Sequence, residues 1–134
     1  MTTHILMVDD EPDAQELFRQ NFRREIRKGD YSFDFAQSGH EALEVIKQKT
    51  PVLVLSDINM PGMSGIELLC ELHAAWPDLP VMIITAYGDA GTEAKARSLG
   101  AERLVMKPVD FSALKDTLQQ ITGGEHESSS YSRG

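Results

Sequence analysis

The chain has 134 residues, a length that predicts one domain with room for a sizeable core. Its formal net charge is −8, with 21 acidic against 13 basic residues, which argues against direct nucleic-acid binding by this domain. A single cysteine excludes a disulfide framework and a thiolate metal site, and no apolar stretch is long enough to span a bilayer. The N-terminus has no signal-peptide pattern, so we expect a cytoplasmic location and no membrane partner.

The chain begins with a short apolar strand over residues 4–8, which ends in three consecutive acids, residues 9–11. Pro12 suits the first turn of a helix, and Gly29 can close that helix. Apolar residues follow Pro12 at helical spacing: Ala14, Leu17, Phe18, Phe22 and Ile26. The pattern therefore predicts one continuous helix after the first strand.

Residues 31–36 are rich in strand formers and alternate in part, which predicts a strand near the edge of the sheet. Ser38 and Glu41 have the spacing of a capping box and open the next helix. That helix stops at Thr50-Pro51, because proline disfavours helical backbone at the residue before it.

An unbroken apolar run over residues 52–55 predicts a strand buried on both faces. This strand delivers one carboxylate, Asp57, at its carboxyl end. Pro61, Gly62 and Gly65 then force a turn. The sequence thus predicts a carboxylate held at one edge of the sheet.

Ser64 and Glu67 form a second capping-box spacing, and the helix they open ends at Trp76. Residues 81–84 are a fully apolar strand that ends in Thr85. The strand is again predicted to be buried on both faces.

The helix predicted over about residues 90–99 has few large apolar residues, so we expect it to be the least firmly packed helix. A last strand is centred on residues 104–106 and ends in Lys107. The final helix begins at Asp110, with Phe111, Leu114, Leu118 and Ile121 on one face.

Strand and helix thus alternate five times, which predicts an α/β fold, a parallel sheet with helices on both faces. Residues 1–122 form one domain in this interpretation. Residues 123–134 have the composition of a disordered tail or linker.

Five polar residues lie at the carboxyl ends of four predicted strands: Asp9, Asp10, Asp57, Thr85 and Lys107. These ends meet along one edge of a parallel sheet, where open α/β sheets bind their ligands. We therefore expect these side chains to form one site.

The chemistry of that site follows from its charge. Carboxylates about 4 Å apart repel each other by on the order of 4 kcal/mol at an effective dielectric near 20. Lys107 offsets one charge, and an all-oxygen ligand set favours a hard divalent cation, Mg²⁺ rather than Ca²⁺. A cation beside a lysine and a hydroxyl suits phosphoryl chemistry, with Asp57 as the nucleophile and Asp9 and Asp10 as metal ligands, directly or through water.

Four motifs in order carry a family resemblance. They are Asp9-Asp10, Ser-Asp-Ile-Asn-Met-Pro-Gly-Met-Ser-Gly around Asp57, Thr-Ala-Tyr-Gly-Asp from Thr85, and Lys107-Pro108. Over about residues 4–122 the chain resembles the CheY-like receiver domain of two-component response regulators. The resemblance implies a flavodoxin-like three-layer sandwich whose five strands lie in the order 2-1-3-4-5, with five helices.

The resemblance also implies that Asp57 accepts a phosphoryl group from a histidine kinase or a histidine phosphotransfer protein. Asp10, Asp57 and the backbone carbonyl of Asn59 would hold Mg²⁺ or Mn²⁺, and Asp9 would act through a bound water. The domain would not be a classical enzyme, although it would catalyse its own phosphotransfer and slow dephosphorylation.

Other family positions concern the switch. Thr85 would move toward the phosphoryl group, Lys107 would pair with it, and the peptide bond before Pro108 would be cis. Leu104 departs from the family, which usually has Tyr or Phe three residues before the lysine. Tyr87 lies at a position that tunes hydrolysis of the acyl phosphate in the family.

The signal would leave through the face built from the helix of residues 90–99, the strand of residues 104–106 and the helix that follows Asp110. This face is the expected surface for a homodimer or a partner protein. The cognate kinase and any output domain are not predicted.

Two alternatives stay open. An aspartyl-phosphate phosphatase usually carries an Asp-x-Asp arrangement after its first strand and a cap over its substrate, whereas this chain has Asp9-Asp10-Glu11 and no cap insertion. A phosphate-independent binding module of the same fold usually lacks the acid pair, the acceptor or the lysine, all of which are present here.

Overall fold

The computed structural model describes residues 2–60, 62–85 and 90–123. Its strands are β1 (Thr3–Val8), β2 (Tyr31–Ala36), β3 (Leu53–Asp57), β4 (Val81–Thr85) and β5 (Arg103–Met106). They form one five-stranded parallel sheet in the order β2-β1-β3-β4-β5. The predicted flavodoxin-like fold and its strand order are thus confirmed.

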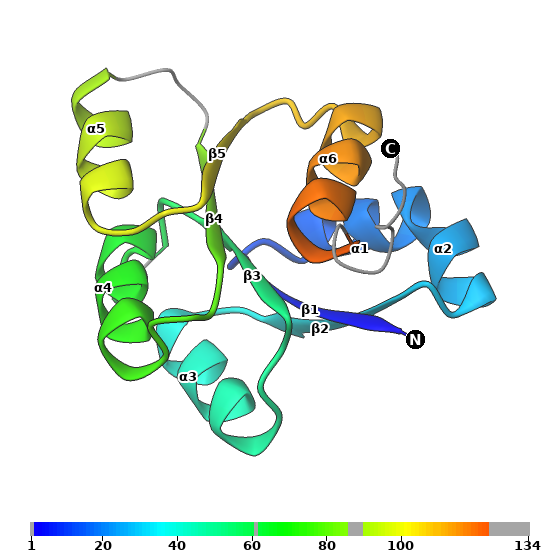
Figure 1. Ribbon diagram of the computed structural model, residues 1–134, viewed down its shortest axis with the longest axis horizontal. Coiled ribbons are helices and arrows are strands. Elements are labelled where there is room, and N and C mark those ends of the chain that lie inside the picture. Colours follow the sequence, from blue (N-terminus) through cyan, green and yellow to red (C-terminus); the bar gives the residue numbers. More distant parts are fainter. Residues whose placement is uncertain (1, 61, 86–89, 124–134) are drawn as a thin grey trace.

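Helices cover both faces of the sheet (Figure 1). The helices are α1 (Pro12–Asn21), α2 (Arg23–Lys28), α3 (Gly39–Gln48), α4 (Gly65–Ala75), α5 (Ala90–Ser98) and α6 (Phe111–Leu118), and a π-helical turn, η1 (Gln119–Gly123), extends α6. In Figure 1, α3, α4 and α5 lie on one side of the strands, and α1, α2 and α6 lie on the other. The carboxyl ends of all five strands therefore open onto one edge between these two layers.

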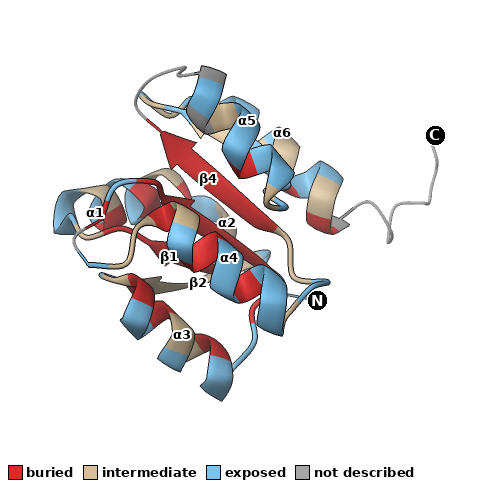
Figure 2. Ribbon diagram, turned by 90° about the vertical axis from the view of Figure 1, so that its left-hand side faces the viewer, coloured by how far each residue is buried: buried red, intermediate tan, exposed pale blue. Residues whose placement is uncertain are grey.

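Two apolar clusters form the core, one on each face of the sheet. β1 shows the division, because Leu6 and Val8 belong to the cluster under α3 and α4, whereas Ile5 and Met7 belong to the cluster under α1 and α6. The inner strands β1, β3 and β4 are buried along most of their length (Figure 2). The edge strands β2 and β5 are mostly half-buried or exposed. β3 is buried at every position, while Val52, which was predicted to begin it, precedes the strand and is exposed.

The described residues form six α-helices, one more than predicted, because the first helix divides at Phe22. Phe22 has φ −105° and ψ 11°, outside regular helical values. Its ring is fully buried and lies 4.9 Å from the ring of Phe33 and 6.0 Å from that of Phe111, measured between centroids. We attribute the bend to this aromatic packing, which helical periodicity alone did not reveal.

Both predicted capping positions begin helices at the edge that carries the acids. Ser64 and Glu67 form a complete capping box at α4. Ser38 caps α3 by accepting from the N–H of Glu41, but the Glu41 carboxylate accepts from the N–H of Gln37 instead of closing the box. The two helix starts are fixed in either case, because each serine oxygen satisfies a free backbone donor.

α5 is weakly anchored compared with α4, as expected from its sequence, although the short α2 buries no residue at all. Ala96 is its one side chain classed as buried among those that the structure describes, whereas α4 buries Leu68, Leu69 and Leu72. Among the described residues, no helix combines the length and the apolar character that crossing a membrane requires. The tail predicted from residue 123 lies, apart from Gly123, outside the described residues.

Candidate functional site

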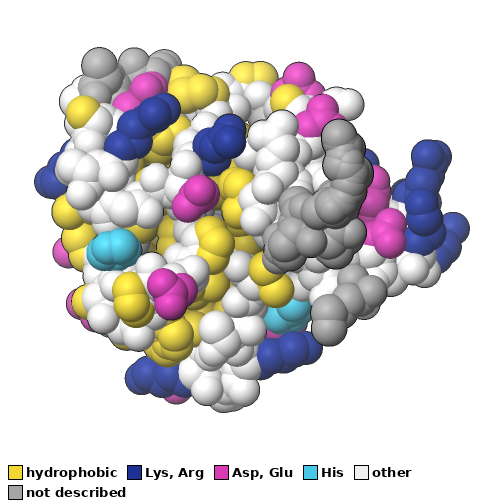
Figure 3. All heavy atoms as spheres, viewed as in Figure 1, with side chains coloured by type: hydrophobic (Ala, Val, Ile, Leu, Met, Phe, Trp, Pro, Cys, Tyr) yellow, Lys and Arg dark blue, Asp and Glu magenta, His cyan; other side chains and the backbone are white. Residues whose placement is uncertain are grey.

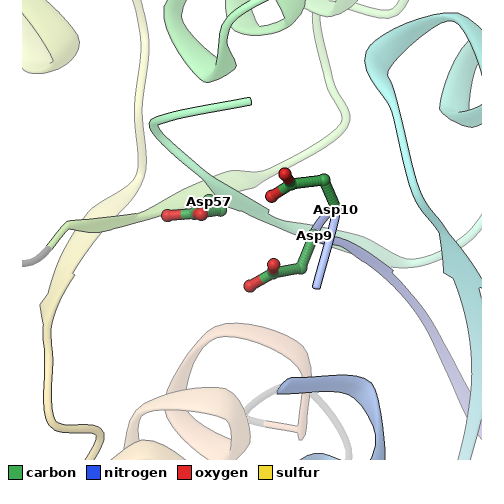
Figure 4. Close-up of side chains that lie close together, drawn as sticks. All are labelled: Asp9, Asp10 and Asp57. Carbon is green, nitrogen blue, oxygen red and sulfur yellow. The ribbon is translucent and has the colours of Figure 1, made fainter. Parts of the chain in front are cut away.

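Three carboxylates meet at the carboxyl edge of the sheet (Figure 4). Asp9 and Asp10 follow β1, and Asp57 ends β3, the neighbour of β1 in the sheet. One oxygen of each carboxylate lies within 4.8 Å of the others, and Figure 4 shows the three side chains projecting toward a common space. Asp9 and Asp57 are buried, and Asp10 is half-buried. The structure thus brings together the acids that the strand ends predicted.

Asp9 is held by its own backbone surroundings. Its Oδ1 accepts a hydrogen bond of 2.9 Å from the N–H of Glu11, and Gln15 Nε2 donates to its carbonyl oxygen at 3.3 Å. Sequence reasoning missed Gln15, because a glutamine one turn into a helix carries no distinguishing signal. These contacts fix the direction in which the carboxylate points.

The burial of the Asp9 carboxylate is only partly compensated. Burial raises the pKa of Asp9, the negative charge of Asp57 raises it further, and the Glu11 hydrogen bond opposes the shift. Its Oδ2 is buried and has no hydrogen-bond partner within the described part of the chain. An orphaned carboxylate oxygen beside two more carboxylates fits a hard divalent cation.

Lys107 supplies the positive charge of the site. Its Nζ lies 3.4 Å from Oδ1 of Asp57, and the N–H of Lys107 donates to the carbonyl oxygen of Thr85 at 2.8 Å. Thr85 is buried at the end of β4. The peptide bond between Lys107 and Pro108 is cis, as the resemblance implies. The predicted lysine and threonine therefore lie at the same edge as the acids.

The loop after Asp57 continues the sheet by one residue and then returns to α4. The N–H of Ile58 donates to the carbonyl oxygen of Ile84, and the N–H of Gly65 donates to the carbonyl oxygen of Ile58, both at 2.9 Å. Asn59 is exposed between these two anchors. Tyr87, the predicted tuning residue, lies outside the described residues.

A model of the response regulator receiver domain matches residues 5–119 of the chain. The chain belongs to this family. Among characterised relatives, the receiver domain is 35% identical to the transcriptional regulatory protein ZraR of Salmonella typhimurium over 92% of its length. It is 33% identical to the response regulator protein FleR of Pseudomonas aeruginosa over 95% of its length. It spans 27% of either relative, so most of each relative has no counterpart here.

Solved receiver structures agree in fold with this receiver domain. The signal receiver domain of an HD domain-containing protein from Pseudomonas fluorescens superposes with a TM-score of 0.84 at 27% identity, covering 94% of this chain and 98% of that one. The receiver domain of NtrX from Brucella abortus gives 0.80 at 30% identity, over 89% and 98% of the two chains. The response regulator TrrA from Thermotoga maritima, solved in complex with Mg(2+)-BeF, gives 0.77 at 32% identity, over 89% and 98%.

A groove of about 340 Å³ opens beside the acids of the receiver domain. Asp9 and Lys107 line it on the polar side, and Leu17, Phe18 and Val109 contribute apolar surface. Leu17 is 49% exposed, although its helical spacing places it with the core residues of α1. The site is therefore open on the side of α1.

The predicted output face of the receiver domain is partly apolar. Leu104 is half-buried, pairs in register with Ile83, and lines a groove of about 350 Å³ together with Met106 and Leu114. Figure 3 shows hydrophobic side chains gathered over the middle of this view, where Figure 1 places β4 and β5. At position 104 the receiver domain thus presents an aliphatic side chain.

Proposed function

We propose that this receiver domain accepts a phosphoryl group on Asp57 from the phosphohistidine of a histidine kinase or a histidine phosphotransfer protein. The observation that carries the proposal is the position of Asp57, whose carboxylate lies close both to the acids that follow β1 and to the ammonium group of Lys107. A nucleophilic carboxylate beside a fixed cation and a metal-binding cluster suits phosphoryl transfer, which depends mainly on positioning and charge stabilisation.

The transfer is a single displacement. A carboxylate oxygen of Asp57 attacks phosphorus, the P–N bond of phosphohistidine breaks, and its electron pair returns to the ring nitrogen of the donor. The product is an acyl phosphate on Asp57 and a histidine free of phosphate. Lys107 pairs with a phosphoryl oxygen, because its Nζ already lies beside the attacking carboxylate.

The all-oxygen cluster fits Mg²⁺ or Mn²⁺. Asp10, Asp57 and the backbone carbonyl of Asn59 would hold the ion, and Asp9 would act through a bound water. When bound, the cation neutralises negative charge on the carboxylates and on the incoming phosphoryl oxygens. The Mg(2+)-BeF complex of TrrA supports this choice of metal.

Phosphorylation would bias the output face of α5, β5 and α6 toward a second state. The phosphoryl group adds nearly two negative charges beside Lys107 and close to the end of β4, where Thr85 lies. The weak anchoring of α5 supports a shift there at low cost. We propose that a homodimer partner, a partner protein or a further domain reads this face in the cytoplasm.

Incubation with acetyl phosphate and Mg²⁺, followed by intact-mass spectrometry, tests the proposal. We expect a mass gain of one phosphoryl group, which Asp57→Asn abolishes and Asp78→Asn, an exposed control, leaves intact. Sustained multiple turnovers with release of phosphate would instead favour the phosphatase. The absence of any mass gain would favour the phosphate-independent binding module.

A further inference from the structure

Gly65, the first residue of α4, lies directly against the strand end that carries Asp57. A Cβ atom at position 65 would come 2.7 Å from Cα of Ile58 and still closer to the carbonyl oxygen of Asp57. Both are backbone atoms, so no side-chain rotation relieves the contact. The capping box of Ser64 and Glu67 fixes the start of α4 from the other side. The loop after Asp57 can therefore pack this closely against the start of α4 because residue 65 has no side chain.

Gly39, the first residue of α3, lies against Met63 at the far end of the same loop. A Cβ atom at position 39 would come 2.7 Å from Sδ of Met63 and 3.0 Å from both its Cβ and its Cγ. The Cβ of Met63 is attached to the backbone, so reorienting the thioether would not remove the whole contact. The strand that precedes α3 ends at Ala36, which accepts a hydrogen bond from the N–H of Asp9 at 3.0 Å.

The two glycines thus connect the loop that follows Asp57 to the helices on either side of it. Neither belongs to the described glycines with positive φ, which are Gly29, Gly62 and Gly100. Alanine could adopt the backbone conformation of Gly39 or Gly65 without that kind of strain. What excludes a side chain at both positions is contact with the loop.

We infer that Gly39 and Gly65 are positioning residues: because they lack side chains, the loop between β3 and α4 packs closely against α3 and α4. This close packing aligns the oxygens of Asp57 and Asn59 with the acids that follow β1. The inference rests on the proposed function, since it concerns the oxygens that would share one cation. Mg²⁺ requires oxygens at about 2.0–2.1 Å in near-ideal octahedral geometry. A displaced loop therefore weakens binding, and changes in such supporting residues cost about 10–100-fold in metal affinity.

Calorimetric titration of the whole chain with Mg²⁺ tests the inference through a steric rescue. We expect Gly39→Ala to weaken Mg²⁺ binding about tenfold. Met63→Ala removes Sδ and Cγ from the crowded contact, so the double variant should recover most of the lost affinity. Gly65→Ala should weaken binding more, because it displaces the backbone of Asp57 itself. Circular dichroism checks that each variant folds. If Gly65→Ala does not fold, the comparison of Gly39→Ala with the Gly39→Ala/Met63→Ala double variant alone tests the inference.

Gly29→Ala provides the control for plain destabilisation. Gly29 has φ +81° and open space around it, so alanine strains the backbone without pressing on the loop. This variant should lose thermal stability and keep its Mg²⁺ affinity. Wild-type affinity in Gly39→Ala, or a loss that Met63→Ala does not rescue, would overturn the inference. A wild-type chain without Mg²⁺ binding would instead contradict the proposed function.

Discussion

The ammonium nitrogen of Lys107 lies 3.4 Å from a carboxylate oxygen of Asp57, although β4 separates the strands that carry them. The side chain of Lys107 is one-third exposed, and that of Asp57 is nearly buried. The lysine reaches across the edge of the sheet from the turn that begins with the cis peptide bond to Pro108. One positive charge thus faces three carboxylates, and the surplus of negative charge leaves a role for a divalent cation.

Replacing Lys107 should separate signal transmission from metal binding. We expect Lys107→Ala to keep Mg²⁺ affinity within a few-fold of wild type, because the oxygen ligands stay in place. The variant should lose most of the phosphorylation-dependent change in hydrogen exchange of α5 and β5. Lys47→Ala, an exposed lysine of α3, is the matched control. A Lys107→Ala chain that still shows the full change would contradict the role of the lysine.

Asp10→Asn should weaken Mg²⁺ binding by at least about tenfold, because it removes a charged ligand and leaves a neutral amide in its place. The measurement is a calorimetric titration at low ionic strength. Asp78→Asn removes an equal charge from an exposed position before β4 and should leave the affinity unchanged. Equal affinities for Asp10→Asn and wild type would exclude Asp10 from the metal site.

The sheet and its acidic edge could be predicted because apolar strand runs and strand-end acids are local patterns. Asp57 and Lys107 meet because parallel strands end together, which needs no knowledge of packing. The bend at Phe22 arises from rings far apart in the chain, and helical periodicity does not encode it. Leu17 fits the apolar pattern of α1 and is nevertheless half exposed, since the pattern does not say where neighbouring elements stop covering the helix.

The buried carboxyl of Asp9 should destabilise the metal-free fold at neutral pH. The pKa of Asp9 is raised above 3.8, its value in an unfolded chain, so the folded chain binds more protons between the two values and stability falls as the pH rises through that window. In EDTA at pH 7, Asp9→Asn should therefore have a higher free energy of unfolding than wild type.

The gain from Asp9→Asn should shrink at pH values near 3.8, where the carboxyl is increasingly protonated in both the folded and the unfolded chain. Thermal unfolding of wild type and Asp9→Asn at pH 7 and near pH 3.8 measures the stability gained by the variant at each pH. At pH 7, Mg²⁺ should make the wild type more stable than Asp9→Asn, because the cation stabilises the wild-type cluster of acids more strongly. Equal destabilisation of the variant at both pH values would contradict this account.

α5 should open more readily than α4. Leu68, Leu69 and Leu72 anchor α4 in the core, whereas Ala96 is the one described buried side chain of α5. A difference of about 1.4 kcal/mol in local opening corresponds to tenfold in exchange rate, so amides of residues 93–98 should exchange at least about tenfold faster than those of residues 68–73. Hydrogen exchange followed by mass spectrometry measures both segments together. Equal protection would argue against a low-cost shift of α5.

Reductive trapping of the acyl phosphate tests the assignment of Asp57 most directly. Borohydride converts an aspartyl phosphate to homoserine, which peptide mapping places in the chain. After phosphorylation in the presence of Mg²⁺, homoserine should appear at position 57 and at no other aspartate. Its appearance at position 9 or 10, or no homoserine despite a mass gain of one phosphoryl group, would contradict the assignment.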